Sequence, residues 1–430
     1  MEPSTVEESS QASNDAFVKK NLNWNFGVNL IDIAFFTISL SVISRETVMP
    51  VLVSKLTDSK FAIGLIPALA TFGYLIPQLL SASFTERLPY KKPITMFIGG
   101  VIERLPFGLI GIVLFFLAEK NPPLTLFLFF LLLVITSVGS GLATPPWLDM
   151  IAKVIPVEKR GLLSGVGNSI GAVMGIFGAL LVGKVLASSS YPNNFAFLFI
   201  LSFSLNIISF IGLALNREPS SLKVNKHLSL KDYLAKLPQI LKTQHNYRRF
   251  IISRSLILVG TMATGFYSVF ATERFMEGSS VASLTGLLTA VLISSQAICN
   301  LGWGFLADRL GHKRVLSSAA FLLMIAALLA FLASSKILLI LTFMFLGSYL
   351  AADQVSALNI ILEFCEEADR PTYIGLTNTL LAPLVALVPL LGAYLASHFG
   401  YSTLFATTAV MALLGGLAMT LWVREPRYKS

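Results

Sequence analysis

Charge is the property that this sequence has least of. Lysine, arginine, aspartate and glutamate together make up 13% of its 430 residues, against roughly 25% in a typical globular chain. So few charged side chains cannot cover the surface of water-soluble domains of this total length. A hydrophobic fraction of 55% also excludes a disordered chain, because low hydrophobicity is what keeps such chains unfolded. The composition therefore indicates a protein whose solvent is lipid.

Cysteine and histidine are also scarce. The two cysteines, Cys299 and Cys365, lie in or at the end of apolar stretches, with no Cys-x-x-Cys or Cys/His spacing, so they indicate neither a metal site nor a redox compartment. The four histidines are scattered over loops and helix ends. A stretch at 178–185 fits the nucleotide loop GxxxxGK but has Val185 where serine or threonine must reach magnesium. We therefore expect no metal, no cofactor and no enzymatic activity.

The apolar residues gather in twelve stretches, separated by charged residues, proline or glycine. A helix that crosses the bilayer core needs about 20 such residues, and each stretch is long enough. The stretches run near 26–52, 61–82, 94–118, 123–151, 161–186, 194–216, 250–272, 282–306, 315–334, 337–362, 372–397 and 402–423. The sequence thus predicts an all-α membrane protein with twelve transmembrane helices.

The basic residues orient these helices. An even number of spans places both termini on one side, and that side then carries 23 of the 32 lysines and arginines, the opposite side 6 and the spans 3. Cytoplasmic loops carry such an excess, so a multi-pass protein of the cell membrane with both termini cytoplasmic is predicted. The tryptophans agree, because all four fall at the predicted inner interface. The net charge of +9 has the same origin, and we expect no nucleic-acid partner.

Polar stretches divide the chain into predicted domains. The start of the chain lacks a basic segment followed by a short apolar core, so it is interpreted as a solvated tail and not as a signal peptide. The polar stretch between spans 6 and 7 includes 228–237, which fits either an amphipathic helix on the inner leaflet or a solvated linker. The predicted domains are a cytoplasmic tail at 1–24, six-helix bundles at 25–216 and 250–424, a cytoplasmic linker at 217–249 and a second tail at 425–430.

The two bundles repeat each other in sequence. Arg160 between spans 4 and 5 recurs 210 residues later as Arg370 between spans 10 and 11, and the run ASFTERLPYKKP at 82–93 matches GFLADRLGHKRV at 304–315. Recurrence at fixed offsets indicates an internal duplication. Parallel six-helix halves related by an axis along the membrane normal are the architecture of a large class of secondary transporters.

The second copy of this loop has glycine, three residues, Asp-Arg, a second glycine and a basic pair. With twelve spans in two halves over about 25–424, the chain resembles the major facilitator superfamily on this motif. In the first copy, Ala82 and Pro89 replace both glycines. The motif residues are Gly304, Asp308, Arg309, Gly311, Lys313 and Arg314, with Glu86 and Arg87 in the first copy.

The resemblance implies a gate on the cytoplasmic side. Asp308 would meet the start of span 5 after Arg160, where its carboxylate can accept hydrogen bonds from free N–H groups. By pseudo-symmetry Glu86 would meet the start of span 11 after Arg370. A hairpin capped by a solvated charge cluster is the alternative.

Charged side chains inside spans are costly and therefore mark candidate functional sites. Asp353 lies about midway along span 10, beside Gln354. The resemblance implies that spans 1, 4, 7 and 10 line a central cavity, in which Asp353 could bind a cation or carry a proton. Further candidates for the substrate or ion pathway are Asp32, Arg45 and Glu46 on span 1 and Gln296 and Asn300 on span 8; the last two are equally compatible with polar contacts between helices.

Other polar side chains are predicted to be structural. We favour a structural ion pair between Glu103 and Arg104 in span 3, and an interfacial pair between Asp149 and Lys153, four residues apart. A stripe of small residues on span 5 allows either static close packing or a moving interface with span 8. The stripe comprises Gly167, Gly171, Gly175, Ala179 and Gly183.

These features predict a secondary transporter of a small solute that works by alternating access, with protons or another ion as coupling partner, and that is monomeric in the bilayer. A non-transporting membrane receptor or assembly factor with the same fold is the alternative.

Overall fold

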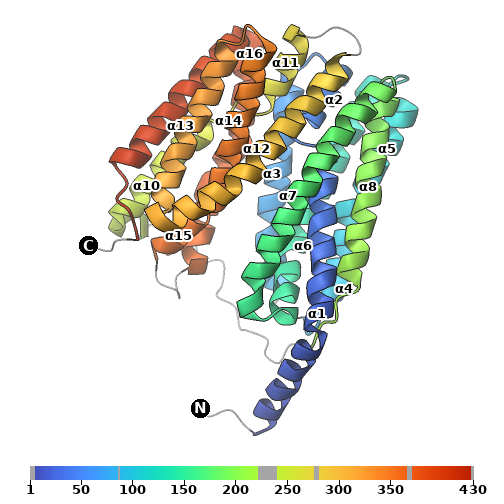
Figure 1. Cartoon of the computed structure of the whole chain (residues 1–430), viewed down its shortest axis with the longest axis vertical. Helices are drawn as coiled ribbons and strands as arrows, with labels where there is room; N and C mark the ends of the chain where they lie inside the picture. The colour runs from blue at the N-terminus through green and yellow to red at the C-terminus, as the bar shows by residue number, and fades with distance from the viewer. Residues whose placement is uncertain (1–4, 86–87, 221–239, 276–279, 366–369, 428–430) are drawn as a thin grey trace. The chain divides into compact units, whose positions relative to one another are not determined.

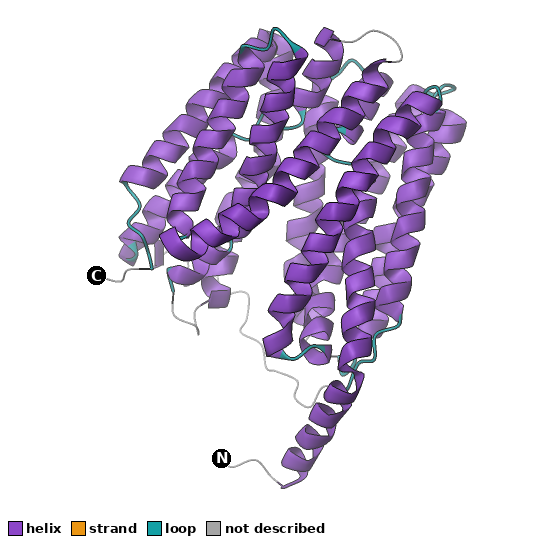
Figure 2. Ribbon diagram, viewed as in Figure 1, coloured by secondary structure: helices purple, strands orange, loops and turns teal. Residues whose placement is uncertain are grey.

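The computed structural model describes residues 5–85, 88–220, 240–275, 280–365 and 370–427. Within these ranges every regular element is a helix (Figures 1 and 2). The elements are α1 (Thr5–Val42), α2 (Val48–Leu56), α3 (Lys60–Thr85), α4 (Lys92–Phe97), η1 (Ile98–Arg104), α5 (Leu105–Leu117), α6 (Pro122–Val154), α7 (Val157–Ser188), α8 (Asn193–Ala214), α10 (His245–Val259), α11 (Phe266–Phe275), α12 (Ser280–Leu310), α13 (His312–Phe331), α14 (Lys336–Ser356), α15 (Asn359–Glu363) and α16 (Arg370–Leu421).

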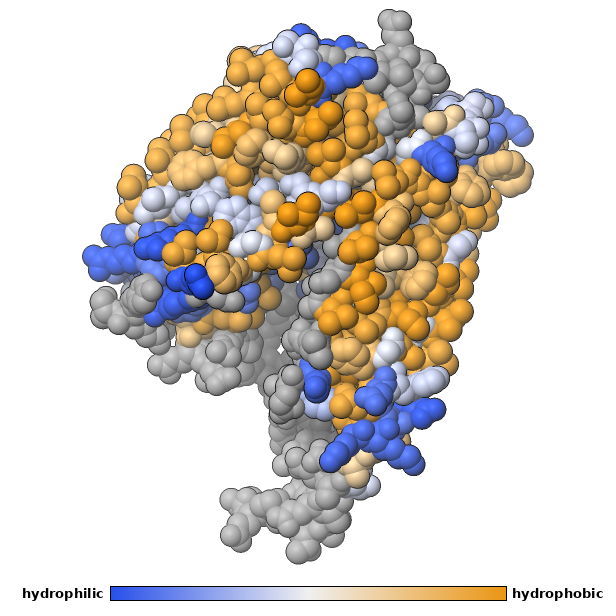
Figure 3. Space-filling view, in the orientation of Figure 1, coloured by the Kyte–Doolittle hydropathy of each residue, from blue (hydrophilic) through white to orange (hydrophobic). Residues whose placement is uncertain are grey.

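Nine helices in the described ranges are long and apolar enough to cross a membrane. One of the nine lies in α16, which joins spans 11 and 12, so the nine helices account for ten of the predicted spans. The other two are also helical: span 5 is α7, and span 7 is divided between α10 and α11. Gly400 has a φ of 80°, a left-handed conformation that glycine adopts without strain, and it separates the two helices of α16. Apolar residues cover the flanks of the helices and hydrophilic residues gather near their ends, as expected for contact with lipid (Figure 3).

Spans 1 and 7 are broken, whereas the sequence predicted them as continuous over 26–52 and 250–272. The first break lies at 43–47, where the Ser44 hydroxyl donates to Glu46 and accepts from its backbone N–H. The second lies at 260–265, where the Thr261 and Thr264 hydroxyls donate to carbonyls three residues earlier. Short polar side chains compete in this way with helical hydrogen bonds. The first span of each half is therefore interrupted by a short non-helical segment.

The tail and the linker differ in how far they are described. α1 begins at Thr5, so most of the predicted solvated tail continues the first helix. The segment 228–237, for which an amphipathic helix or a solvated linker was predicted, lies outside the described residues.

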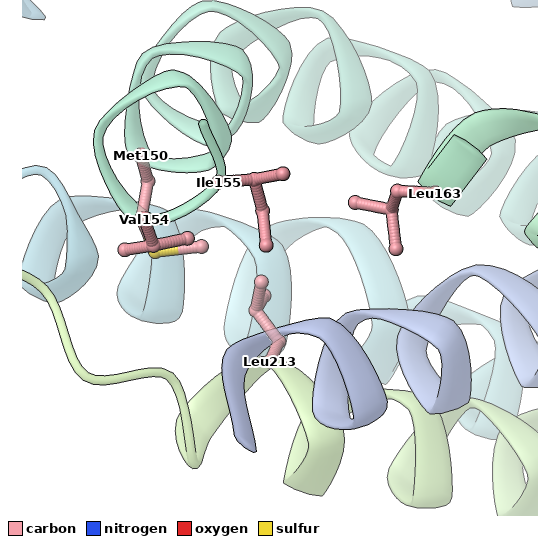
Figure 4. Packing of buried hydrophobic residues seen from close by; sticks show 5 residues of the cluster. All are labelled: Met150, Val154, Ile155, Leu163 and Leu213. Carbon is pink, nitrogen blue, oxygen red and sulfur yellow. The ribbon is translucent and has the colours of Figure 1, made fainter. Parts of the chain in front are cut away.

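The chain forms two compact units. Unit 1 comprises residues 1–43, 72–178 and 190–227, and unit 2 comprises residues 44–71, 179–189 and 228–430. In unit 1, α1 and α5 both pack on α8, and α6 packs on η1 and α5. A buried cluster near the ends of α6 and α8 consists of Met150, Val154, Ile155, Leu163 and Leu213 (Figure 4). In unit 2, α13 packs on α14 and α16, α12 on α14, and α10 on α16.

Segments of the predicted first bundle belong to unit 2, so the compact units do not coincide with the predicted bundles 25–216 and 250–424. The contacts explain why. The buried hydroxyl of Thr289 on α12 donates to Thr47 just before α2, at 2.7 Å. The backbone of Gly183 lies directly against Gly286 of α12. The Lys60 ammonium lies 4.0 Å from the centre of the Tyr401 ring.

The small-residue stripe of span 5 packs on α1 over most of its described length. Side chains placed on Gly167 and Gly171 would meet Ile33 and Thr37 of α1. Gly183 has a different neighbour, Gly286 of span 8. Close packing on α1 therefore accounts for the first part of the stripe, and the contact with span 8 lies at its last glycine.

The same hydrogen-bonded pair closes the first and last helices of each half. In unit 1 the Asn25 side-chain amide donates to the Arg217 carbonyl (3.0 Å) and its oxygen accepts from the Arg217 N–H (2.9 Å). In unit 2 Asn246 makes both bonds with Arg424, at 3.0 and 2.8 Å. We call each pair the Asn–Arg clasp.

A glutamate follows each clasp arginine. Glu218 contacts the loop before span 3, and Glu425 contacts the loop before span 9. The Glu218 carboxylate accepts from the backbone N–H groups of Lys91 and Lys92 (both 2.8 Å) and from the Lys153 ammonium at 2.5 Å. The Glu425 carboxylate lies against Gly311. Gly311 has a φ of 91° and separates α12 from α13. A side chain at Gly311 would overlap this carboxylate.

The contact between Gly183 and Gly286 leads to a stability prediction. A methyl group at Gly286 would overlap the Gly183 backbone, so Gly286→Ala should destabilise the protein by the roughly 1–3 kcal/mol typical of overpacking. The measured effect should be a lower thermal unfolding midpoint in detergent. Gly302→Ala on the same helix is the matched control, because nothing lies within 4 Å of a methyl group there. Equal midpoints for the two variants would contradict the contact.

Glu425 leads to a pH prediction. Burial, and next the Glu363 carboxylate, raise the pKa of Glu425 above 4.5, although Arg427, Lys313 and Arg314 act in the opposite direction. The folded state therefore binds this proton more tightly than the unfolded state, and the resulting stability is complete below pH 4.5 and is lost as pH rises through the raised pKa.

Glu425→Gln keeps this position neutral at every pH. Its unfolding midpoint should match the wild type below about pH 4.5 and exceed it increasingly at higher pH. Glu119→Gln, at an exposed acid, is the control that should show no such trend. A gap between Glu425→Gln and wild type that does not change with pH, or that narrows as pH rises, would refute the prediction.

Candidate functional site

An ion pair between α10 and α14 is a partly exposed charged site in the spans of unit 2. The guanidinium of Arg254 donates from Nη1 to Asp353 Oδ1 and from Nη2 to Asp353 Oδ2, the latter at 2.9 Å. Two parallel bonds of this kind fix the orientation of both groups. The Arg254 side chain is 8% exposed and that of Asp353 is 24% exposed, so the carboxylate is the more accessible partner.

Polar side chains surround this pair. Tyr349 lies one turn before Asp353 on α14 and is buried. Gln354 is exposed, and its side-chain oxygen lies 3.5 Å from the amide nitrogen of Gln296 on α12. The structure thus brings three predicted pathway residues together from two helices. Asn300, one turn beyond Gln296, keeps a buried side-chain oxygen with no hydrogen-bond partner among the described residues.

A second charged cluster lies buried in unit 1. Arg104 donates from Nη1 to Glu103 (2.9 Å) and from Nη2 to Asp32 (3.2 Å). Asp32 also accepts from the Ser209 hydroxyl at 2.6 Å and from the Trp147 indole N–H at 3.2 Å. The side chains of Asp32, Glu103 and Arg104 are each less than 10% exposed.

The backbone before Arg104 contributes to this cluster. Residues Ile98–Arg104 form a π-helix, η1, and the Gly99 carbonyl accepts from Arg104 Nη1 at 2.9 Å. Single π turns inside longer helices are frequent at functional sites. The predicted ion pair between Glu103 and Arg104 is present, and Asp32, predicted as a pathway residue, is its third member.

The remaining candidate charges are the neighbours Arg45 and Glu46 and the pair predicted between Asp149 and Lys153. Arg45 and Glu46 lie in the break between α1 and α2, and the Glu46 carboxylate accepts from the Ser44 hydroxyl at 3.1 Å. The predicted pairing of Asp149 with Lys153 is wrong. Asp149 pairs with Lys91 at 3.2 Å, because Glu218, after span 6, takes the Lys153 ammonium.

The gate motif is described in part. Arg309 stacks over the Phe305 ring at 4.1 Å, and the Lys313 ammonium donates to the Thr420 carbonyl at 3.0 Å. Arg314 follows Lys313 in the first turn of α13. A methyl group placed on Gly304 would meet no atom within 4 Å. Glu86 and Arg87 lie outside the described residues, as do the side chains of Asp308, Arg160 and Arg370, so the predicted gate contacts stay predictions.

Sequence reasoning missed the partner of Asp353 and both clasps. Arg254 is one of the few basic residues inside the predicted spans, which is the signal that could have linked it to Asp353. The clasps had a plainer signal, because the triplet Arg-Glu-Pro at 217–219 recurs at 424–426, each time directly after the last helix of a half.

Comparison with known proteins places this chain in a family. The model of the Major Facilitator Superfamily matches residues 34–277 and 255–430. The multidrug resistance protein MdtL of Salmonella paratyphi C (strain RKS4594) is 25% identical over 181 residues, which are 42% of this chain and 46% of that protein. The alignment thus spans about half the length of this curated relative.

Solved structures share the fold at low identity. A mutant of the nucleoside transporter NupG has a TM-score of 0.72 at 13% identity, over 93% of this chain and all of that chain. The D-xylose-proton symporter has a TM-score of 0.69 at 17% identity, over 94% and 98% of the two chains. These neighbours carry a twelve-helix fold in two six-helix bundles, in agreement with the twelve predicted spans. The chain is therefore an integral multi-pass membrane protein that belongs to the Major Facilitator Superfamily, a family of transporters and not of enzymes.

Proposed function

We propose that this protein is a secondary active transporter that moves a small solute by alternating access and couples its movement to protons. The observation that carries the proposal is the Arg254–Asp353 pair between α10 and α14. An ionised pair within a span is costly to maintain in lipid, and its carboxylate is partly exposed while its guanidinium is buried. A proton arriving at Asp353 would cancel the attraction and release Arg254.

This release would connect a proton to a change of conformation. Removing one charge of a buried pair leaves the other uncompensated, which is strongly unfavourable. A state in which Arg254 reaches water or substrate would then become favoured over the state with the pair intact. Differential stability of two states is what a coupling ion must supply. Gln354 and Gln296, which approach each other beside the pair, are proposed to hydrogen-bond the solute.

The cluster in unit 1 is proposed to be scaffold. Asp32 accepts hydrogen bonds from three different side chains and is 3% exposed. Water and solute therefore reach Asp32 less easily than they reach Asp353. A buried network with several hydrogen bonds of this kind stabilises one arrangement of helices.

The proposed moving parts are the bundles 25–216 and 250–424, joined by the linker 217–249, with both termini in the cytoplasm. Asp308 and Glu86 are proposed to hold the cytoplasmic side closed and to release it on opening. The likeness to a multidrug resistance protein supports including drugs among the candidate solutes. A thermal-shift screen against metabolites and drugs would identify a substrate, since a ligand that binds only the folded state raises apparent stability.

Asp353→Asn tests the coupling. In proteoliposomes, a variant that cannot take up the proton should lose accumulation driven by a pH gradient, by at least tenfold, while exchange of labelled for unlabelled solute continues. Exchange continues because it needs no net proton movement. Asp149→Asn is the matched control, since this acid pairs with Lys91 outside the proposed site, and it should accumulate solute like the wild type. Gradient-driven accumulation by Asp353→Asn at the wild-type level would refute the role of Asp353.

Arg104→Met tests the scaffold. It leaves Asp32 and Glu103 without their guanidinium, which should destabilise the protein by about 3–5 kcal/mol. Adding Asp32→Asn removes one of the two acids and should restore part of the loss, as measured by unfolding in detergent. A double variant no more stable than Arg104→Met would show that Asp32 and Arg104 are not coupled.

A further inference from the structure

Both Asn–Arg clasps place an arginine side chain on the surface without using it. The hydrogen bonds of each clasp involve only the backbone N–H and carbonyl of Arg217 or Arg424. Any residue except proline could supply both groups. Both copies nevertheless carry arginine, and both arginines are exposed. The recurrence of the side chain therefore needs a reason other than the clasp.

In unit 1 the Arg217 side chain is held beside an exposed tryptophan. Its guanidinium stacks over the Trp24 ring at 4.9 Å and donates from Nη1 to Asn21 at 2.9 Å. Trp24 is 45% exposed and donates its indole N–H to the Leu215 carbonyl at 2.9 Å. A guanidinium has five N–H donors, and no acid among the described residues forms an ion pair with Arg217. It is thus oriented and still able to bind an anion.

Unit 2 has an exposed tryptophan and more positive charge at its clasp. Trp422 is 55% exposed, and its carbonyl accepts from Arg249 Nη1 at 3.4 Å. Arg248, Arg249 and Arg424 are all exposed. Within the described part of the chain none of the three has an acidic partner.

Apolar side chains lie next to each cationic group. Ile211 on α8 and Leu215 just after it precede Arg217 by six and two residues, and they are 51% and 45% exposed. Leu421, three residues before Arg424, is 75% exposed. An exposed apolar strip that ends at tryptophan and arginine matches the boundary between acyl chains and headgroups, where tryptophan is enriched.

We propose that each half of this protein binds an anionic phospholipid at its Asn–Arg clasp, with the lipid phosphate on the guanidinium groups and an acyl chain along the apolar strip. Arginine is suited to this ligand because its fork binds phosphate oxygens in pairs. The two sites would hold the seam between the first and last helix of each half in the headgroup layer. Under the orientation proposed above they face the inner leaflet, which carries anionic lipid; binding itself does not depend on the transport proposal.

The test measures lipid binding to the full-length protein in detergent, without any flux. Phosphatidylglycerol and phosphatidylcholine are titrated, and bound lipid is counted by native mass spectrometry, with the unfolding midpoint as second readout. Phosphatidylglycerol should bind more tightly and raise the midpoint more. Arg217→Gln and Arg424→Gln should each weaken binding at one site by roughly fivefold, the effect of one basic residue near an anionic surface, and the double variant should lose the preference for phosphatidylglycerol.

Lys120→Gln is the matched control, because it removes one exposed positive charge from a loop far from both clasps in the sequence, and it should bind like the wild type. Inorganic phosphate at equal ionic strength separates a lipid site from a phosphate site. The proposal is overturned if the double variant keeps the wild-type preference, if Lys120→Gln loses as much binding as the arginine variants, or if inorganic phosphate alone raises the midpoint as much as phosphatidylglycerol.

Discussion

The lack of water in the bilayer core is the constraint on which this structure depends. A polar group there must find its partner within the protein, and two described groups of charged side chains inside the spans do so over short distances. Arg254 meets Asp353 within unit 2, and Arg104 meets Asp32 and Glu103 within unit 1. The two sites differ in exposure, since the carboxylate of Asp353 is open and that of Asp32 is enclosed. The same requirement thus supports a coupling role for one site and a scaffold role for the other.

Duplication explains what the two halves share and where they differ. Each half breaks its first span, closes its first and last helices with an Asn–Arg clasp, and places the next glutamate at a loop before a later span. The ion pairs near those glutamates differ between the halves, because the acid and the base lie on opposite segments. Lys153, at the end of span 4, pairs with Glu218, whereas Glu363, at the end of span 10, pairs with Arg427. The backbone bonds of the clasp persisted while the charged side chains around it diverged.

The Asn–Arg clasp joins the first and last helices of each half. The backbone of the arginine joins two helices through this clasp, and the arginine side chain remains exposed. The first and last helices of a half are the ones that continue into the tail and the linker, so a fastening there limits how far those segments can separate the helices. A rigid half is what a transporter that rocks as two bodies requires.

Composition and hydropathy determined the class and the number of spans, because lipid demands long apolar stretches that can be counted in the sequence. Residues that recur at fixed offsets indicated the internal repeat. Local chemistry also allowed the ion pair of Glu103 and Arg104 to be predicted, since the two are neighbours. Pairing between distant residues was decided by the tertiary structure alone. Asp149 pairs with Lys91 and not with the nearby Lys153, and Asp353 pairs with Arg254, 99 positions earlier in the chain. Hydropathy ranks single positions, whereas the partner of a buried charge depends on which helices pack together, and that is a property of the folded chain.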